Sequence, residues 1–170
     1  MSKPIYEELA ETGKELTNIL SSFDEKQINE VPFAGSWTAG QVAEHVLKSV
    51  SGTLQNVNSD VQPTERNPVE YAEQLKTIFL NFNIKFSSPD FILPSNEPKD
   101  KGSLIGSLAE SMSGLAHAAK TEDLSATCTA FEMPNMGQLT RIEWLSFADA
   151  HTKRHIHQLK NIKQALNNKN

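Results

Sequence analysis

Apolar side chains recur at helical spacing along most of this chain. In residues 5–23 they return every three or four positions, and acidic side chains largely fill the positions between them. This pattern is typical of an amphipathic helix that packs one face on a core. The stripe consists of Ile5, Leu9, Thr12, Leu16, Ile19 and Phe23.

A similar stripe predicts a second helix over residues 104–119. Gly106 and Gly114 interrupt it, and each glycine costs about 1 kcal/mol relative to alanine in a helix interior. We therefore expect tertiary packing to hold this helix. Its apolar positions are Leu104, Leu108, Met112, Leu115 and Ala119.

Two threonines mark the starts of two further helices. Thr38 is followed three residues later by Gln41, and Thr140 in the same way by Glu143. Both pairs have the form of a capping box, in which each side chain bonds the other residue's backbone N–H. The first helix should fray within residues 52–60, whereas the second should continue almost to the end of the chain.

A third start signal lies at Asn67 and Pro68, because asparagine is a good N-cap and proline suits the first helical position. The helix that follows should bury Val69, Ala72, Leu75, Phe79 and Phe82.

Residues 84–102 lose the helical period, and the prolines 89, 94 and 98 forbid a continuous helix there. A structureless connection of this length is uncommon in a compact domain. One interpretation is a lid or wall over a site, to which Phe86, Phe91 and Ile92 would contribute. The other is a surface crossover between neighbouring helices that run parallel.

These stripes predict an all-α protein, and 170 residues are the usual size of a single domain, here 1–170. The chain has 16 Lys and Arg against 21 Asp and Glu, which argues against nucleic acid as a main partner. Cys128 is the single cysteine. We expect it to be a small buried side chain in a loop or short helix, with no catalytic role.

The lone cysteine and the N-terminal sequence also bear on the compartment. One cysteine cannot form an internal disulfide. Acidic residues stand where a signal peptide needs an apolar run, and no segment has the apolar length of a membrane span. We therefore expect a cytoplasmic protein with no membrane partner.

Three of the five histidines lie on or beside inward helix faces. His151 and His155 occupy the middle of the apolar stripe of the last helix, and a spacing of four residues projects both imidazoles from one face. His45 lies beside the stripe of the helix that starts at Thr38. His117 and His157 fall on polar faces, so we expect them in solvent.

Three inward imidazoles from two helices permit two interpretations. They can share a metal ion, as side chains on facing helices do in bundle cores. Alternatively, each is a core histidine satisfied by a hydrogen bond. The spacing alone leaves both open.

The residues around these histidines offer no clear base. Thr152 stands where an HExxH metalloprotease has its glutamate, and Glu44 is expected to point outward. Lys153 and Arg154 are interpreted as a charged pair on a solvated face. Gln158 shares the face of His151 and His155, so it either orients an imidazole or a bound water, or is a polar residue at the edge of the stripe.

Two segments resemble the DinB-like superfamily, near its YfiT-like metal-dependent hydrolases. They are PFAGSWTAGQVAEHVLKS, residues 32–49, and GQLTRIEWLSFADAHTKRHIHQLKNI, residues 137–162. The first has a tryptophan followed eight positions later by a histidine, and the second has the pattern HxxxHxxQ. The helix order is also similar over nearly the whole chain.

The resemblance implies a four-helix bundle with a divalent metal ion, nickel or zinc, held by His45, His151 and His155. It also implies a small-molecule substrate and a homodimer. The leading expectation is a metal-dependent hydrolase that activates a bound water against an amide or ester. The alternatives are a metal-dependent thiol S-transferase that uses a low-molecular-weight thiol, and a non-catalytic, stress-associated protein that binds metal or dimerises.

Overall fold

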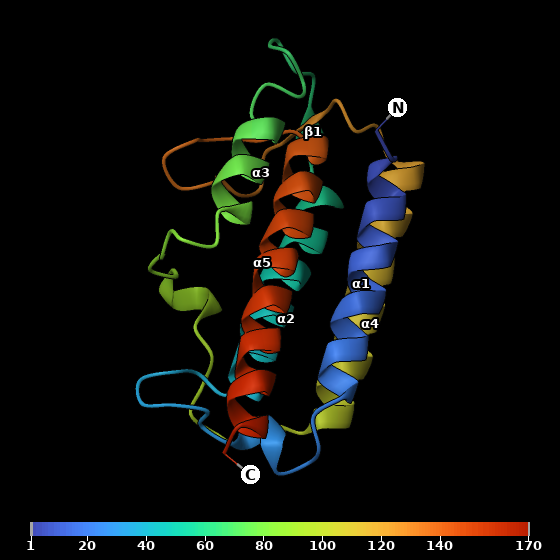
Figure 1. The fold of residues 1–170 in the computed structure, drawn as a ribbon. Helices are drawn as coiled ribbons and strands as arrows, with labels where there is room; N and C mark the ends of the chain where they lie inside the picture. The colour runs from blue at the N-terminus through green and yellow to red at the C-terminus, as the bar shows by residue number, and fades with distance from the viewer. Residues whose placement is uncertain (1, 170) are drawn as a thin grey trace.

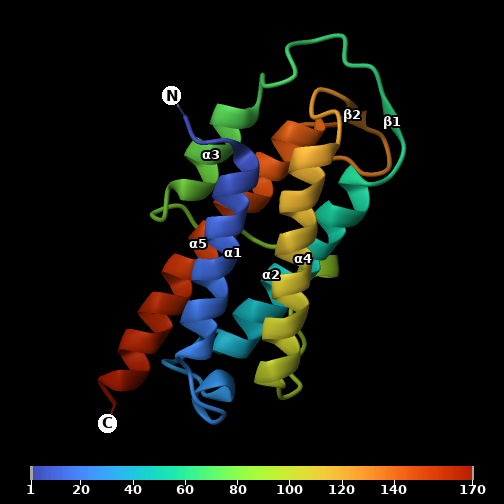
Figure 2. The same cartoon turned by 90° about the vertical axis from the view of Figure 1, so that its right-hand side faces the viewer.

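Four long helices form an all-α bundle in the computed structural model, which describes residues 2–169 (Figure 1). They are α1 (Ile5–Ser21), α2 (Ala39–Val57), α4 (Lys101–Thr121) and α5 (Arg141–Asn167). Helices α1 and α5 run in one direction, and α2 and α4 run in the other (Figures 1 and 2). Because α1 and α2 each pack against both α4 and α5, the four helices enclose a common core.

The remaining elements are short. Helix α3 packs against α5, and the two strands pair with each other antiparallel. These elements are η1 (Gln27–Asn29), β1 (Val61–Gln62), α3 (Ala72–Leu80), η2 (Asp90–Ile92) and β2 (Thr127–Cys128).

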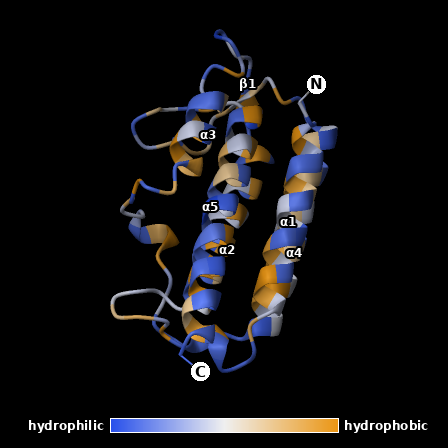
Figure 3. Cartoon of the chain, in the orientation of Figure 1, coloured by the Kyte–Doolittle hydropathy of each residue, from blue (hydrophilic) through white to orange (hydrophobic). Residues whose placement is uncertain are grey.

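The core is built from the predicted stripes. Each long helix carries both hydrophobic and hydrophilic residues (Figure 3), and the apolar stripe positions Leu9, Val46, Leu108 and Leu159 are fully buried. Burying an apolar side chain of this size is worth roughly 1.5–3 kcal/mol. The bundle is therefore held mainly by the faces that the sequence marks as apolar.

Helices α1 and α4 approach closely at Gly13. A Cβ built on this glycine would lie 2.9 Å from the Cβ of Met112. That distance is shorter than side chains tolerate, so only glycine lets the two helices keep this separation.

Both capping boxes are present as predicted. The Thr38 side chain accepts from the backbone N–H of Gln41, the Thr140 side chain accepts from that of Glu143, and both reciprocal bonds are formed. The first helical stripe is also confirmed, although α1 ends at Ser21 and the buried Phe23 follows it.

The predicted start of the third helix at Pro68 is wrong, because α3 begins at Ala72. The start of α5 holds the preceding residues as turns: the Thr140 hydroxyl donates to the Pro68 carbonyl at 2.7 Å, and the Tyr71 N–H donates to Glu143 at 2.9 Å. Val69 and Phe82, predicted to be buried, are 50% and 43% exposed.

Cys128 is buried as predicted, but it lies in a strand instead of a loop or short helix. Its N–H donates to the Leu139 carbonyl at 2.9 Å. The strand ties the segment before α5 to the segment after α2, and burial raises the pKa of the thiol to about 11.

Residues 84–100 run along the outside of the bundle, past α2, to the start of α4 (Figure 1). Side chains of α2 fix this connection: Lys48 donates to the Leu93 carbonyl at 2.7 Å, and Glu44 accepts from the Ser95 N–H at 2.8 Å. Glu44 also pairs with Lys99 at 2.6 Å. The connection does cross between two parallel helices, but it is packed and anchored.

Lys153 and Arg154 are not simply a solvated pair. Lys153 forms an ion pair with the buried Asp149 at 2.7 Å. Arg154 donates to the carbonyls of Asn81, at 2.9 Å, and Ile84. These two cations therefore fasten α5 internally and to the start of the connection.

None of the helices in the described part of the chain combines the length and the apolar content needed to cross a membrane.

Candidate metal centre

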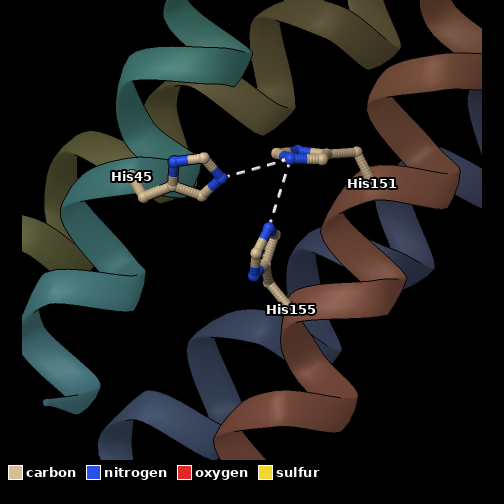
Figure 4. A group of neighbouring side chains, drawn as sticks. All are labelled: His45, His151 and His155. Atoms are coloured by element: carbon tan, nitrogen blue, oxygen red, sulfur yellow. Dashed lines mark hydrogen bonds between the residues drawn. The ribbon is translucent and has the colours of Figure 1, made fainter. Parts of the chain in front are cut away.

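The three inward histidines meet between α2 and α5. His45 projects from α2, and His151 and His155 project from α5, so that their rings converge on one point (Figure 4). The Nε2 atom of His151 lies 3.2 Å from Nε2 of His45 and 3.2 Å from Nε2 of His155. All three side chains are buried. Such a group can hold a metal ion.

Two of the imidazoles are held in orientation by hydrogen bonds at Nδ1. Nδ1 of His45 lies 2.8 Å from the Ile92 carbonyl oxygen, and Nδ1 of His155 lies 2.8 Å from Oε1 of Gln158. Both partners are acceptors, so each Nδ1 carries the proton and donates. The Nε2 atoms of His45 and His155 therefore both present lone pairs toward His151.

Hydrogen bonding alone cannot satisfy this cluster. A proton on Nε2 of His151 can serve only one of the two lone pairs, and Nδ1 of His151 is buried without a partner. A divalent ion would serve three Nε2 lone pairs at once. At Zn–N distances of about 2.0–2.1 Å, tetrahedral ligands are about 3.3 Å apart, which fits the observed 3.2 Å spacings.

The electrostatics keep the three imidazoles neutral. Burial lowers the pKa of His155 to about 3, and it lowers the pKa of His151 well below its ordinary value, with the two neighbouring histidines adding to the effect. Burial also lowers the pKa of His45, although the Ile92 carbonyl opposes the shift. Neutral imidazole is the form that ligates metal ions.

Aromatic rings surround the cluster. Phe147 stacks on His151 with ring centroids 5.2 Å apart, Phe79 meets the same imidazole edge-on at 5.8 Å, and the Trp37 ring lies 5.2 Å from His45. These rings limit the positions that the imidazoles can adopt. They also lower the local polarity, which strengthens electrostatic interactions within the site.

A cavity of about 780 Å³ opens beside His151, between α2, α3, α5 and the connection. Phe86, Phe91 and Ile92 line it, so the connection forms one wall of this cavity. No aspartate or glutamate among residues 2–169 lines this cavity. Its volume is in the range of small-molecule sites.

His117 and His157 lie outside the cluster. Both are exposed, as predicted, and His157 instead stacks on Phe82 with ring centroids 4.2 Å apart. Sequence reasoning missed the Ile92 carbonyl, because a backbone acceptor has no residue-type signature. It also missed the contact of Trp37 with His45, for which the eight-residue spacing was the available signal.

Comparison with known proteins agrees with this architecture. The family model of the DinB superfamily matches residues 8–159, a span that includes all three histidines. The chain is also 24% identical over 165 residues to an uncharacterized protein, YuaE, of Bacillus subtilis (strain 168), covering 92% of this chain and 95% of that protein. No solved structure matches the chain. Because this family model matches most of the chain, the protein belongs to the DinB superfamily.

Proposed function

We propose that His45, His151 and His155 ligate a divalent ion, nickel or zinc, and that the protein is a metal-dependent hydrolase of a small molecule. The observation that carries this proposal is the convergence of three Nε2 atoms, two of them fixed as lone-pair donors by bonds at Nδ1. Three protein ligands leave a coordination position open, which is typical of catalytic sites.

The chain's own residues would orient the proposed metal ligands and shield one of them. A bound divalent ion would lower the pKa of a coordinated water and would polarise an amide or ester carbonyl. The Ile92 carbonyl and the Gln158 amide hold two imidazoles in the required tautomer. The cavity admits a substrate on the side of His151, and Phe147 shields that imidazole.

Thiol transfer is a second candidate, and the lining of the cavity favours it. Hydrolysis usually needs a proton shuttle, yet no carboxylate among residues 2–169 lines the cavity, and Glu44 is engaged by Lys99 and Ser95. A low-molecular-weight thiol needs no such base, because a coordinating thiol loses its proton to solvent.

The metal content of the purified, untagged protein tests the ligand assignment. After growth with several divalent metals, we expect near-stoichiometric nickel or zinc in the wild type and its loss in His151→Ala. The matched control is His157→Ala, which removes an exposed histidine of the same helix and should keep the metal. A wild type without metal under every supply would refute the assignment and leave a non-catalytic histidine-lined bundle.

The two enzymatic candidates separate in a substrate screen with the metal-loaded protein. Chelator-sensitive hydrolysis of a nitrophenyl ester or a nitroanilide would support the hydrolase. Chelator-sensitive consumption of a low-molecular-weight thiol by an aryl chloride would support thiol transfer instead. Metal binding without either reaction would favour a binding protein.

The homodimer that the resemblance implies is also a proposal. Sedimentation velocity of the full chain tests it, and a monomer at all concentrations would remove it.

A further inference from the structure

Three exposed phenylalanine rings lie at the rim of the cavity. Phe86, Phe91 and Phe131 line it, and they are 46%, 61% and 44% exposed. The rings of Phe91, from the connection, and Phe131, from the segment before α5, meet edge to face with centroids 5.5 Å apart. A single exposed ring is ordinary, whereas several exposed rings around one cavity are typical of a binding site.

Ring contacts continue from the rim into the cavity. Phe86 packs on Phe79 with centroids 5.3 Å apart, and Phe79 meets Phe147 edge-on at 5.0 Å. Phe79 also meets the imidazole of His151 edge-on at 5.8 Å. Because all of these residues line the cavity, one aromatic wall leads from solvent to the histidine cluster.

A second row of rings begins at Phe131. Its ring lies 6.1 Å from that of Trp144, which meets Phe147 edge-on at 5.8 Å. Met133 and Met136, both partly buried, also line the cavity, and flexible methionine side chains adapt to the shape of a ligand. A volume of about 780 Å³ suits a small molecule, and aromatic walls favour an aromatic ligand that can stack on them or meet their edges.

The charges of the cavity favour a neutral ligand. Apart from Lys48 and His151, no lining residue among 2–169 carries an ionisable side chain. Nζ of Lys48 already donates to the Leu93 carbonyl at 2.7 Å, and it lies 3.7 Å from a carboxylate oxygen of Glu44. A charged ligand would therefore lose water and find no free charged partner in this lining, which is unfavourable.

We propose that the cavity binds neutral aromatic small molecules, which enter past Phe91 and Phe131 and lie with their ring against Phe79. The substrate of the reaction at the histidine cluster is then a neutral aromatic compound whose reacting group reaches the side of His151. This inference names a substrate class and rests on the proposed function for the reaction. Binding of the ring itself needs no metal ion.

Calorimetric titration with three probes that share a naphthalene ring tests the charge preference. The probes are 2-naphthalenemethanol, the 2-naphthoate anion and the 2-naphthalenemethylammonium cation. Both the purified and the chelator-treated protein are titrated, because a carboxylate could ligate an ion in the first and not in the second. In the chelator-treated protein we expect the alcohol to bind roughly tenfold more tightly than either charged probe. A charged probe that binds this protein as tightly as the alcohol does would overturn the proposal.

The aromatic preference is tested with decahydro-2-naphthalenemethanol, which keeps the neutral alcohol but lacks the aromatic faces. We expect it to bind roughly 2- to 10-fold more weakly than 2-naphthalenemethanol, because aromatic pairs are lost. Equal or tighter binding of the decahydro probe would show that the cavity recognises apolar bulk and would overturn the aromatic substrate class.

Variants of the rim test the location of the site. Phe91→Ala and Phe131→Ala should each bind 2-naphthalenemethanol roughly 2- to 10-fold more weakly than the wild type does. Phe33→Ala is the matched control, because the Phe33 ring is 55% exposed but does not line the cavity, and it should bind like the wild type. An equal loss in all three variants would indicate nonspecific adsorption. A lowered melting temperature of Phe91→Ala with unchanged affinity would indicate a purely structural ring, and either result overturns the proposal.

Metal content and probe binding together separate this proposal from the proposed function. No saturable binding of 2-naphthalenemethanol to the wild type overturns the aromatic site even when the protein holds near-stoichiometric metal. Binding that depends on Phe91 in a protein that takes up no metal supports the site and refutes the proposed metal-dependent function. A homodimer that Phe91→Ala dissociates and that the probe leaves intact would instead assign the rim to a second copy of the chain.

Discussion

Replacing Gln158 with leucine should weaken metal binding without touching a proposed ligand. In the structure, Oε1 of Gln158 accepts from Nδ1 of the buried His155 at 2.8 Å. Leucine fills a similar volume but offers no acceptor, so the imidazole loses the bond that fixes its tautomer and ring orientation. Losing such an outer partner typically lowers metal affinity by about 10- to 100-fold, or roughly 1.4–2.8 kcal/mol of binding free energy.

The assay is competition for zinc against a chromophoric chelator of known affinity. Gln158→Glu is the control, because it keeps an acceptor beside Nδ1 and should bind zinc at least as tightly as the wild type. Circular dichroism checks that both variants keep the helical bundle. An affinity of Gln158→Leu within about twofold of the wild type would refute the reasoning, since the expected loss is at least tenfold.

Three further predictions concern stability and reactivity. Burial raises the pKa of Glu143, but its hydrogen bonds with Arg66, Tyr71 and Thr140 lower it more, so the net pKa is below 4.5. The free energy of unfolding of the wild type should therefore decrease as the pH falls below that value. In urea unfolding, Glu143→Gln should show a weaker dependence on pH. Gly13→Leu should cost about 1–3 kcal/mol of unfolding free energy by overpacking against Met112, and an unchanged denaturation midpoint would contradict this. Cys128, with its pKa near 11, should resist iodoacetamide at pH 8 until the protein unfolds, as mass spectrometry would show.

Local signals predicted the helices best. The capping boxes at Thr38 and Thr140 are formed as expected, because each depends on four consecutive residues. The predicted helix start at Pro68 was wrong because the conformation of this segment depends on distant residues. The backbone of residues 68–71 bonds to Thr140 and Glu143, partners about 70 residues away that no local pattern contains.

In the candidate site, too, local patterns predicted some features, whereas others depend on distant contacts. Periodicity placed His45, His151 and His155 on inward faces, and the structure brings their Nε2 atoms together. The acceptor for His45 is a backbone carbonyl of the connection, 47 residues away in sequence.

The Ile92 carbonyl connects the cavity with the histidine cluster. The segment that carries it also forms a wall of the cavity and meets α2 at Lys48 and Glu44. A ligand that holds this segment in place therefore favours the His45 tautomer that an ion requires. By thermodynamic linkage, the ion must tighten ligand binding by the same factor. Under the proposed function, ligand binding in the cavity and ion binding at the histidine cluster would therefore be coupled, and each affinity would have meaning only at a stated concentration of the other species.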